Sequence, residues 1–327
     1  MSQSHFKKNL KTYIECLFYA CASSFLFATL VGALLAPAPH FYILAKKGKP
    51  FALLSFALSS ILTLFIMNNM NAFLIYSVFV GSFLVFVMLQ TSKKVLTSQL
   101  ILQSTGLSLF ILSFFLISKV GLNYENIHHG LTTYIQSSQK ILNAEPRFLE
   151  KLNKNVEIKK MWKQPHEMAT GILNQAPSYI IAFSLLFALI NILLLRKWST
   201  KLFSKKENLK MWKAPEFMIW VLIVSFLPII FDKEPFVVIG SNFLRVCLFI
   251  YFLQGLSVFS FMFERRKLPF LFQILFLALL SLINIPLPTG EDIFSHILIN
   301  LPMMIGFCDV WFDFRNRYNN ASKRSLL

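Results

Sequence analysis

Arg245 is the side chain whose chemistry most needs an explanation, because it lies about eight residues inside the apolar run 237–263. A charge at that depth in a membrane is costly and needs a partner or a ligand. Asn242 shares its helical face. Five side chains near the same outer level are candidate partners: Asp232, Glu234, Glu291, Asp292 and His296. We predict an internal ion pair. The alternative is an anion-binding site formed by Arg245, Asn242 and His296.

Recognisable catalytic motifs are absent from the sequence. There is no Ser-His-Asp set, HExxH helix, Gly-rich phosphate loop or pair of carboxylates at a catalytic spacing. The four cysteines, Cys16, Cys21, Cys247 and Cys308, fall inside apolar runs and form neither a disulfide pattern nor a metal motif. We therefore expect no enzyme, no bound metal and no cofactor.

A stripe of small residues recurs every four positions in the N-terminal apolar run: Ala20, Ser24, Ala28, Gly32 and Ala36. Small side chains on one helical face let another helix approach closely in a membrane. The stripe predicts close packing, either within this chain or against a separate membrane subunit. Its continuation to Ala36 favours one unbroken helix.

Composition predicts the elements that must position these residues. Hydrophobic residues make up 56% of the 327-residue chain, charged residues 14%, and the mean hydropathy is +0.60, which is too apolar for a soluble domain. The fold class is therefore all-α, a polytopic helical membrane protein. Nine apolar runs are predicted to be helices: 12–36, 51–67, 72–89, 99–120, 172–195, 216–231, 237–263, 268–285 and 293–311.

Charge predicts how these helices are threaded. The net charge of +17 is concentrated in short connections, as the positive-inside rule requires, so no nucleic-acid partner is expected. Alternation of the runs places both lysine clusters, 7–11 and 46–49, on the cytoplasmic side. The stretch 12–45 then makes two short passes that turn between Gly32 and Pro39. We predict about ten crossings with both termini cytoplasmic; the alternative is nine crossings, with one cluster outside.

Four regions follow from this topology. Residues 1–120 and 172–314 form N-terminal and C-terminal groups of membrane helices, and residues 315–327 form a basic cytoplasmic tail. Residues 121–171 form a small extracytoplasmic segment of two amphipathic helices, separated at Glu145–Pro146. The related stretches "KMWKQPHEM" (160–168) and "KMWKAPEFM" (210–218) are predicted to anchor the starts of two helices, each with Pro in the first turn.

Several short motifs resemble a known family. They are "APAPHFYILAKKGKP" at 36–50, "WKAPEFMIW" at 212–220, "YFLQGLSVFSF" at 251–261 and "GFCDVWFDFRNR" at 306–317. Together they resemble the YybS-like family of uncharacterised bacterial polytopic membrane proteins. That family looks distantly similar to the substrate-binding subunits of energy-coupling-factor transporters. The segment 121–170 carries no matching motif.

The resemblance implies a role in solute uptake with separate energy-supplying partners. In energy-coupling-factor subunits a small-residue stripe on the first helix docks the coupling membrane subunit, and Ala20, Ser24 and Ala28 match that pattern. Because this chain has no Walker A motif, a coupling subunit with ATPases, or a gradient, would supply the energy. Ten crossings exceed the six that are usual in such subunits.

Two functions remain open from the sequence. The first is a solute-binding or transport-related subunit of the bacterial inner membrane, in contact with the lipid bilayer. The alternative is a non-catalytic membrane scaffold or assembly factor. Polar side chains that converge from several helices would favour the first, whereas a smooth apolar interior with a patterned outer segment would favour the second.

Overall fold

The computed structural model describes residues 3–318 except 30–31, 121–123, 146–147, 151–158, 161, 200–202, 204–206, 232, 234 and 270–292. All regular elements among these residues are helices. In the same part of the chain, five helices are long and apolar enough to cross a membrane: α3, α4, α5, α9 and α11. The chain is therefore a helical membrane protein, as predicted, while the number of crossings stays a prediction.

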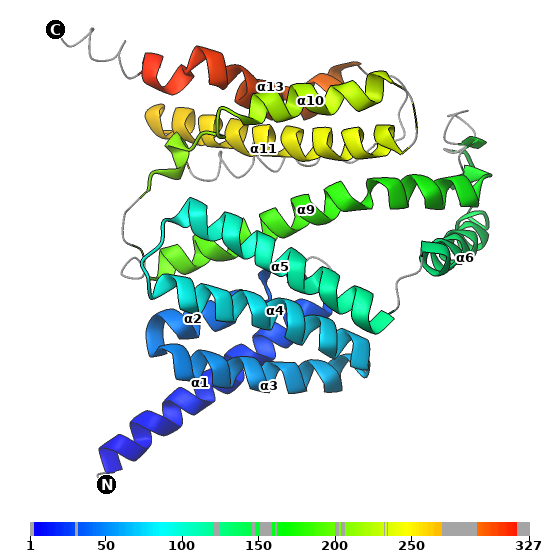
Figure 1. Cartoon of the computed structure of the whole chain (residues 1–327). Coiled ribbons are helices and arrows are strands. Elements are labelled where there is room, and N and C mark those ends of the chain that lie inside the picture. Colours follow the sequence, from blue (N-terminus) through cyan, green and yellow to red (C-terminus); the bar gives the residue numbers. More distant parts are fainter. Residues whose placement is uncertain are drawn as a thin grey trace, which may run out of the picture. The chain divides into compact units, whose positions relative to one another are not determined.

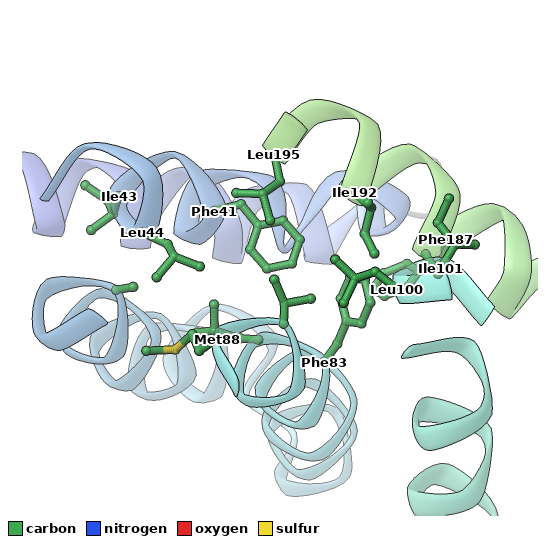
Figure 2. Packing of buried hydrophobic residues seen from close by; sticks show 14 of the residues in the cluster. Phe41, Ile43, Leu44, Phe83, Met88, Leu100, Ile101, Phe187, Ile192 and Leu195 are labelled. Atoms are coloured by element: carbon green, nitrogen blue, oxygen red, sulfur yellow. The ribbon is translucent and has the colours of Figure 1, made fainter. Parts of the chain in front are cut away.

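Residues 1–122 and 180–207 form the first of two compact units. Its helices are α1 (Gln3–Ala28), the 3-10 helix η1 (Gly32–Leu35), α2 (Ala38–Lys47), α3 (Lys49–Met67), α4 (Met70–Thr91), α5 (Thr97–Val120) and the later part of α9 (Pro165–Trp198). Figure 2 shows its apolar core, in which Phe41 of α2, Phe83 of α4 and Phe187 of α9 converge. Their rings lie 5.2 to 5.4 Å apart between centroids.

α1 and α2 form an antiparallel hairpin. Two contacts join them in opposite chain order: Glu15 with Lys47 (2.7 Å) and Tyr19 with Tyr42 (ring centroids 4.9 Å apart). A third, from Ser23 Oγ to the carbonyl of Ala36 (2.6 Å), reaches the residue two positions before α2. The lysine cluster 46–49 thus returns to the level of Glu15, near the start of α1. Two short passes over 12–45 require such a return, and the single unbroken helix that the stripe favoured is wrong because α1 ends at Ala28.

Capping side chains form the turn between α3 and α4. Asn68 ends α3 with a left-handed backbone (φ 44°), a conformation that asparagine adopts more readily than most residues. Asn69 Oδ1 accepts from the N–H groups of Asn71 (2.8 Å) and Ala72 (3.3 Å), which lack partners within the helix. The uncharged turn at 68–71 is therefore specified locally.

Residues 123–179 and 208–327 form the second unit. It contains α6 (Tyr124–Leu142), the first part of α9, the 3-10 helix η3 (Leu209–Met211), α10 (Met218–Ile230), α11 (Phe236–Arg265) and α13 (Ile293–Phe312). In Figure 1, α11 lies alongside α10 and α13, and it packs against both.

Glycine permits the close approach of α11 and α13. A Cβ atom on Gly306 would lie 1.9 Å from the carbonyl oxygen of Tyr251, and one on Gly255 would lie 1.7 Å from that of Pro302. These separations are too short for any side chain, so the two backbones touch at this crossing.

The predicted helix positions can now be compared with the observed ones. Every predicted run except 268–285, which lies almost wholly outside the described residues, contains a helix. α6 confirms a helix in the first part of the segment 121–171, whose extracytoplasmic placement stays a prediction, and most of the second predicted helix lies outside the described residues. Pro165 begins α9 as predicted. The same expectation for Pro215 is wrong, because α10 begins three residues later, at Met218.

Candidate functional site

A buried polar cluster lies inside the first unit, and we call it the His40 network. Four helices contribute side chains that are 0% exposed: Ser23 and Ser24 from α1, His40 from α2, Ser55 and Ser59 from α3, and Tyr76 from α4. None of these side chains carries a fixed charge. Polar groups removed from water must find partners inside the protein.

His40 is hydrogen-bonded through both ring nitrogens. Nδ1 lies 3.1 Å from Ser55 Oγ, and Nε2 lies 2.9 Å from Tyr76 OH and 3.2 Å from Ser59 Oγ. Ser55 Oγ donates to the carbonyl of Cys16 (3.3 Å), so its remaining role toward Nδ1 is that of acceptor. This assigns the proton of a neutral imidazole to Nδ1 and leaves Nε2 to accept from a hydroxyl.

Tyr76 connects the imidazole to α1. Its hydroxyl lies 2.6 Å from Ser23 Oγ and 2.8 Å from Ser59 Oγ. Ser24 Oγ extends the cluster by donating to the carbonyl of Ser59 (2.9 Å). The network therefore joins four helices through short hydrogen bonds among neutral groups, an arrangement that both fixes their packing and presents polar atoms within an apolar unit.

The second unit contains a charged counterpart, which we call the Asp309–Arg315 network. Both charged side chains are 0% exposed and form an ion pair through Asp309 Oδ2 and Arg315 Nη2. Arg315 Nη1 donates to Ser257 Oγ (3.0 Å) and to the carbonyls of Lys210 (3.0 Å) and Trp212 (2.7 Å). Arg315 Nε has no hydrogen-bond partner among the described residues.

Gln254 completes this second network from α11. Its Nε2 donates to Asp309 Oδ2 (3.0 Å), and its Oε1 accepts from the N–H of Ala214 (3.0 Å). Asp309 Oδ1 accepts from the N–H of Phe314 (3.1 Å). The segment around η3 is thereby held against α11 and the end of α13, so the network has a structural role in this unit.

Sequence reasoning missed both networks. The sequence predicts Arg315 to be the first residue of a basic tail, and this is wrong because its side chain is buried. The available signals were His40, a titratable side chain at the end of a long apolar run, and Asp309, a carboxylate within the apolar stretch before Arg315. Neither signal shows which distant helix supplies the partner.

Arg245 is half-buried in α11, and it forms no ion pair or hydrogen bond with a described residue. Its four candidate acidic partners, Asp232, Glu234, Glu291 and Asp292, lie outside the described residues, as does the side chain of His296. The ion pair and the anion-binding site both stay predictions.

Asn242 forms hydrogen bonds with the backbone of α9 beside a proline inside that helix. Pro177 lies inside that helix, where proline disrupts the backbone ladder. Asn242 Oδ1 accepts from the N–H of Ser178 (3.0 Å), and its Nδ2 donates to the carbonyls of Asn174 (2.6 Å) and Val238 (2.8 Å). Both polar atoms of the Asn242 amide thus form hydrogen bonds within the second unit. Its role in binding a ligand stays a prediction.

The small-residue stripe divides between two environments. Ala20 and Ser24 are 0% exposed, and Ser24 bonds to the backbone of α3, so these two positions pack within the chain. Ala28 is exposed at the end of α1. Docking of a separate subunit stays a prediction, with Ala28 as its accessible position.

The helices, the polar networks buried within them and the basic connections define a polytopic helical membrane protein. A family model described as "Predicted membrane protein (DUF2232)" matches residues 16–289, and the chain belongs to this family. The predicted resemblance to the YybS-like family is thereby confirmed. No curated protein and no solved structure matches the chain.

Proposed function

We propose that this protein is a non-catalytic, solute-binding or transport-related membrane subunit with the His40 network at its polar centre. The observation that carries the proposal is the convergence of hydroxyl groups from α3 and α4 on the imidazole of α2. Ser23 of α1 joins this cluster through the hydroxyl of Tyr76. Ionisable side chains buried among membrane helices commonly mark solute or ion pathways. Polar side chains that converge from several helices, as in this network, favour a solute-binding subunit over a scaffold with a smooth apolar interior.

Energy for transport would come from outside this chain. We propose a coupling membrane subunit with ATPases, or an ion gradient, as the source, because the sequence contains no Walker A motif. The first of these sources is the one that the distant resemblance of the YybS-like family to energy-coupling-factor subunits implies.

Native mass spectrometry of the protein in mild detergent tests solute binding. We expect a small molecule to copurify with the wild-type chain and to be lost from Ser59→Ala and Tyr76→Phe. Ser82→Ala is the matched control, since its hydroxyl bonds only to its own helix, at the carbonyl of Phe79 (3.0 Å). Equal retention by all variants would refute a solute site at the network.

A membrane scaffold is the second candidate. It is favoured by the fact that the His40 network finds its hydrogen-bond partners within the chain and that the second network holds the chain's own η3 segment. Ala28→Leu tests docking of a partner membrane protein, which a scaffold and a transport subunit that uses a coupling subunit would both need, because a large side chain there would block close approach of a partner helix. Loss of a copurifying membrane protein with unchanged folding would support docking at Ala28.

We further propose that both termini and the cluster 46–49 face the cytoplasm of a bacterial inner membrane. Gly48 has a φ of +93°, so a cysteine there would be strained. Lys49 is exposed and is the better labelling position. In a cysteine-free background, Lys49→Cys should react with an impermeant reagent only after lysis; labelling in intact cells would defeat the ten-crossing topology.

A further inference from the structure

α6 has three different faces along its length. One packs within the second unit: Thr132 and Ile135 are buried, His128 Nε2 lies 3.0 Å from Thr170 Oγ1, and Gln139 donates to the carbonyl of Trp162. These contacts fix the rotation of α6 about its own axis.

A second face is apolar and exposed, and we call it the α6 stripe. It consists of Tyr124, Ile127, Tyr134 and Ile141, which are 55%, 36%, 71% and 74% exposed. Their spacings of three and seven residues place them in one row on a helix.

The remaining face of α6 is polar. Four exposed residues lie on it, opposite the α6 stripe: His129, Thr133, Gln136 and Lys140. Each residue turns the helix by about 100°, so Gln136 points roughly 200° away from Tyr134. The exposed part of α6 is therefore apolar on one side and hydrophilic on the other.

α6 follows one candidate membrane span along the chain and contacts another. Three residues separate it from α5, a candidate span whose Phe114 and Ile117 are each 67% exposed. Thr170, which α6 contacts, belongs to a stretch of α9 that has no charge between Glu167 and Arg196.

We propose that α6 lies in the lipid headgroup layer at the level where α9 begins, with the α6 stripe inserted against the acyl chains. Tyrosine favours this boundary because its ring is apolar and its hydroxyl stays hydrated. A helix that presents a charged or polar face opposite an apolar one is typical of interfacial binding. The occupant of the stripe is the lipid bilayer, which makes α6 a third contact with the membrane beside the spans that flank it.

Fluorescence quenching in the reconstituted full chain tests this placement. A cysteine-free background with an environment-sensitive label at Tyr134→Cys would be compared with the same label at Gln136→Cys, in phosphatidylethanolamine–phosphatidylglycerol vesicles. We expect brominated lipid to quench the label at 134 several-fold more than at 136, and aqueous iodide to show the reverse order. Strong iodide quenching at 134, or shielding from both quenchers by a protein, would overturn the proposal.

A photo-crosslinking measurement avoids the cysteine replacements, two of which are at buried positions. Benzoylphenylalanine at Tyr134 retains an aromatic side chain in the otherwise native protein. Irradiation in membranes should add the mass of a phospholipid at 134 and none at 136. A crosslink from 134 to a second copy or to another protein would assign the α6 stripe to a protein interface and refute the lipid placement.

Discussion

The two buried networks both hold helices or segments together through polar side chains removed from water, but one uses neutral groups and the other uses charges. The His40 network joins four helices of the first unit with neutral groups, whereas the Asp309–Arg315 network holds an irregular segment of the second unit with full charges. Neutral hydrogen bonds contribute modestly, and a buried neutral group left without its partner costs about 1–3 kcal/mol. A buried ion pair contributes little net stability, yet breaking it is costly because one charge is left unpaired. The second unit should therefore be the more sensitive to single substitutions.

Arg315→Met should have the largest effect. It leaves the carboxylate of Asp309 buried without its cation, which typically costs about 3–5 kcal/mol. The free energy of unfolding in mixed detergent micelles would measure the loss. Replacing Asp309 by Leu in the same chain should recover part of it, since no charge is then left unpaired, while Gln254 Nε2 and the N–H of Phe314 lose their acceptor. Arg317→Met is the control, because Arg317 is exposed; an equal loss there would contradict the assigned role.

Gly306→Ala tests the close helix crossing of the second unit. The added methyl would meet the carbonyl oxygen of Tyr251, and overpacking of this kind costs about 1–3 kcal/mol. Gly106→Ala in α5 is the matched control, since a Cβ there meets nothing within 4 Å. We expect Gly106→Ala to be neutral or stabilising because alanine favours helix. Equal melting temperatures for the two variants would disprove the close crossing.

Tyr76→Phe provides the corresponding test of the neutral network. It removes the hydroxyl shared by His40, Ser23 and Ser59, which should cost about 1–2 kcal/mol. Tyr13→Phe, at an exposed tyrosine of α1, serves as the control. A loss of unfolding free energy as large as that of Arg315→Met would contradict the expectation that the neutral network is the less sensitive of the two.

The smallest effect is expected at Asp313, which forms an ion pair with Lys213 (2.7 Å) beyond the end of α13. Burial alone would raise the pKa of Asp313, but the hydrogen bonds and charge of Lys213, with a contribution from Asn316, outweigh burial and hold this pKa below 3.8. A lowered pKa in the folded state stabilises the protein above the unfolded pKa. This contribution disappears as the pH falls through the folded value.

Asp313→Asn should therefore remove a small part of the stability at pH 7 and reduce its loss below pH 3.8. Unfolding measured as a function of pH would show the difference between the two curves. Because both side chains are about one-third exposed, solvent screening keeps the effect small. Parallel curves for the variant and wild type would exclude a role of this ion pair in acid stability.

Local signals in the sequence account for most of the helix positions. α4 lies within two residues of the predicted run 72–89 at both ends, because a long apolar run between polar residues specifies a span by itself. The return of residues 46–49 toward the start of α1 was also predictable. If both lysine clusters lie on the cytoplasmic side, the chain between them must cross the membrane an even number of times.

The candidate site was less accessible to sequence reasoning. Arg245 attracted attention because a charge in an apolar run is visible to any linear scan. A linear scan does not single out the hydroxyls of Ser55, Ser59 and Tyr76, since serine and tyrosine are common in membrane helices. Only their hydrogen-bond distances to His40 distinguish them.

The sequence by itself determined the membrane class, the positions of the helices and the sidedness proposed for the loops, because these depend on composition, run length and charge along the chain. Only the tertiary structure decided that His40 meets Tyr76 and that Asp309 pairs with Arg315 inside a network reaching back to Lys210. The physical reason is that hydrogen bonds and ion pairs depend on separations of about 3 Å, and those separations arise from helix packing between segments far apart in the chain.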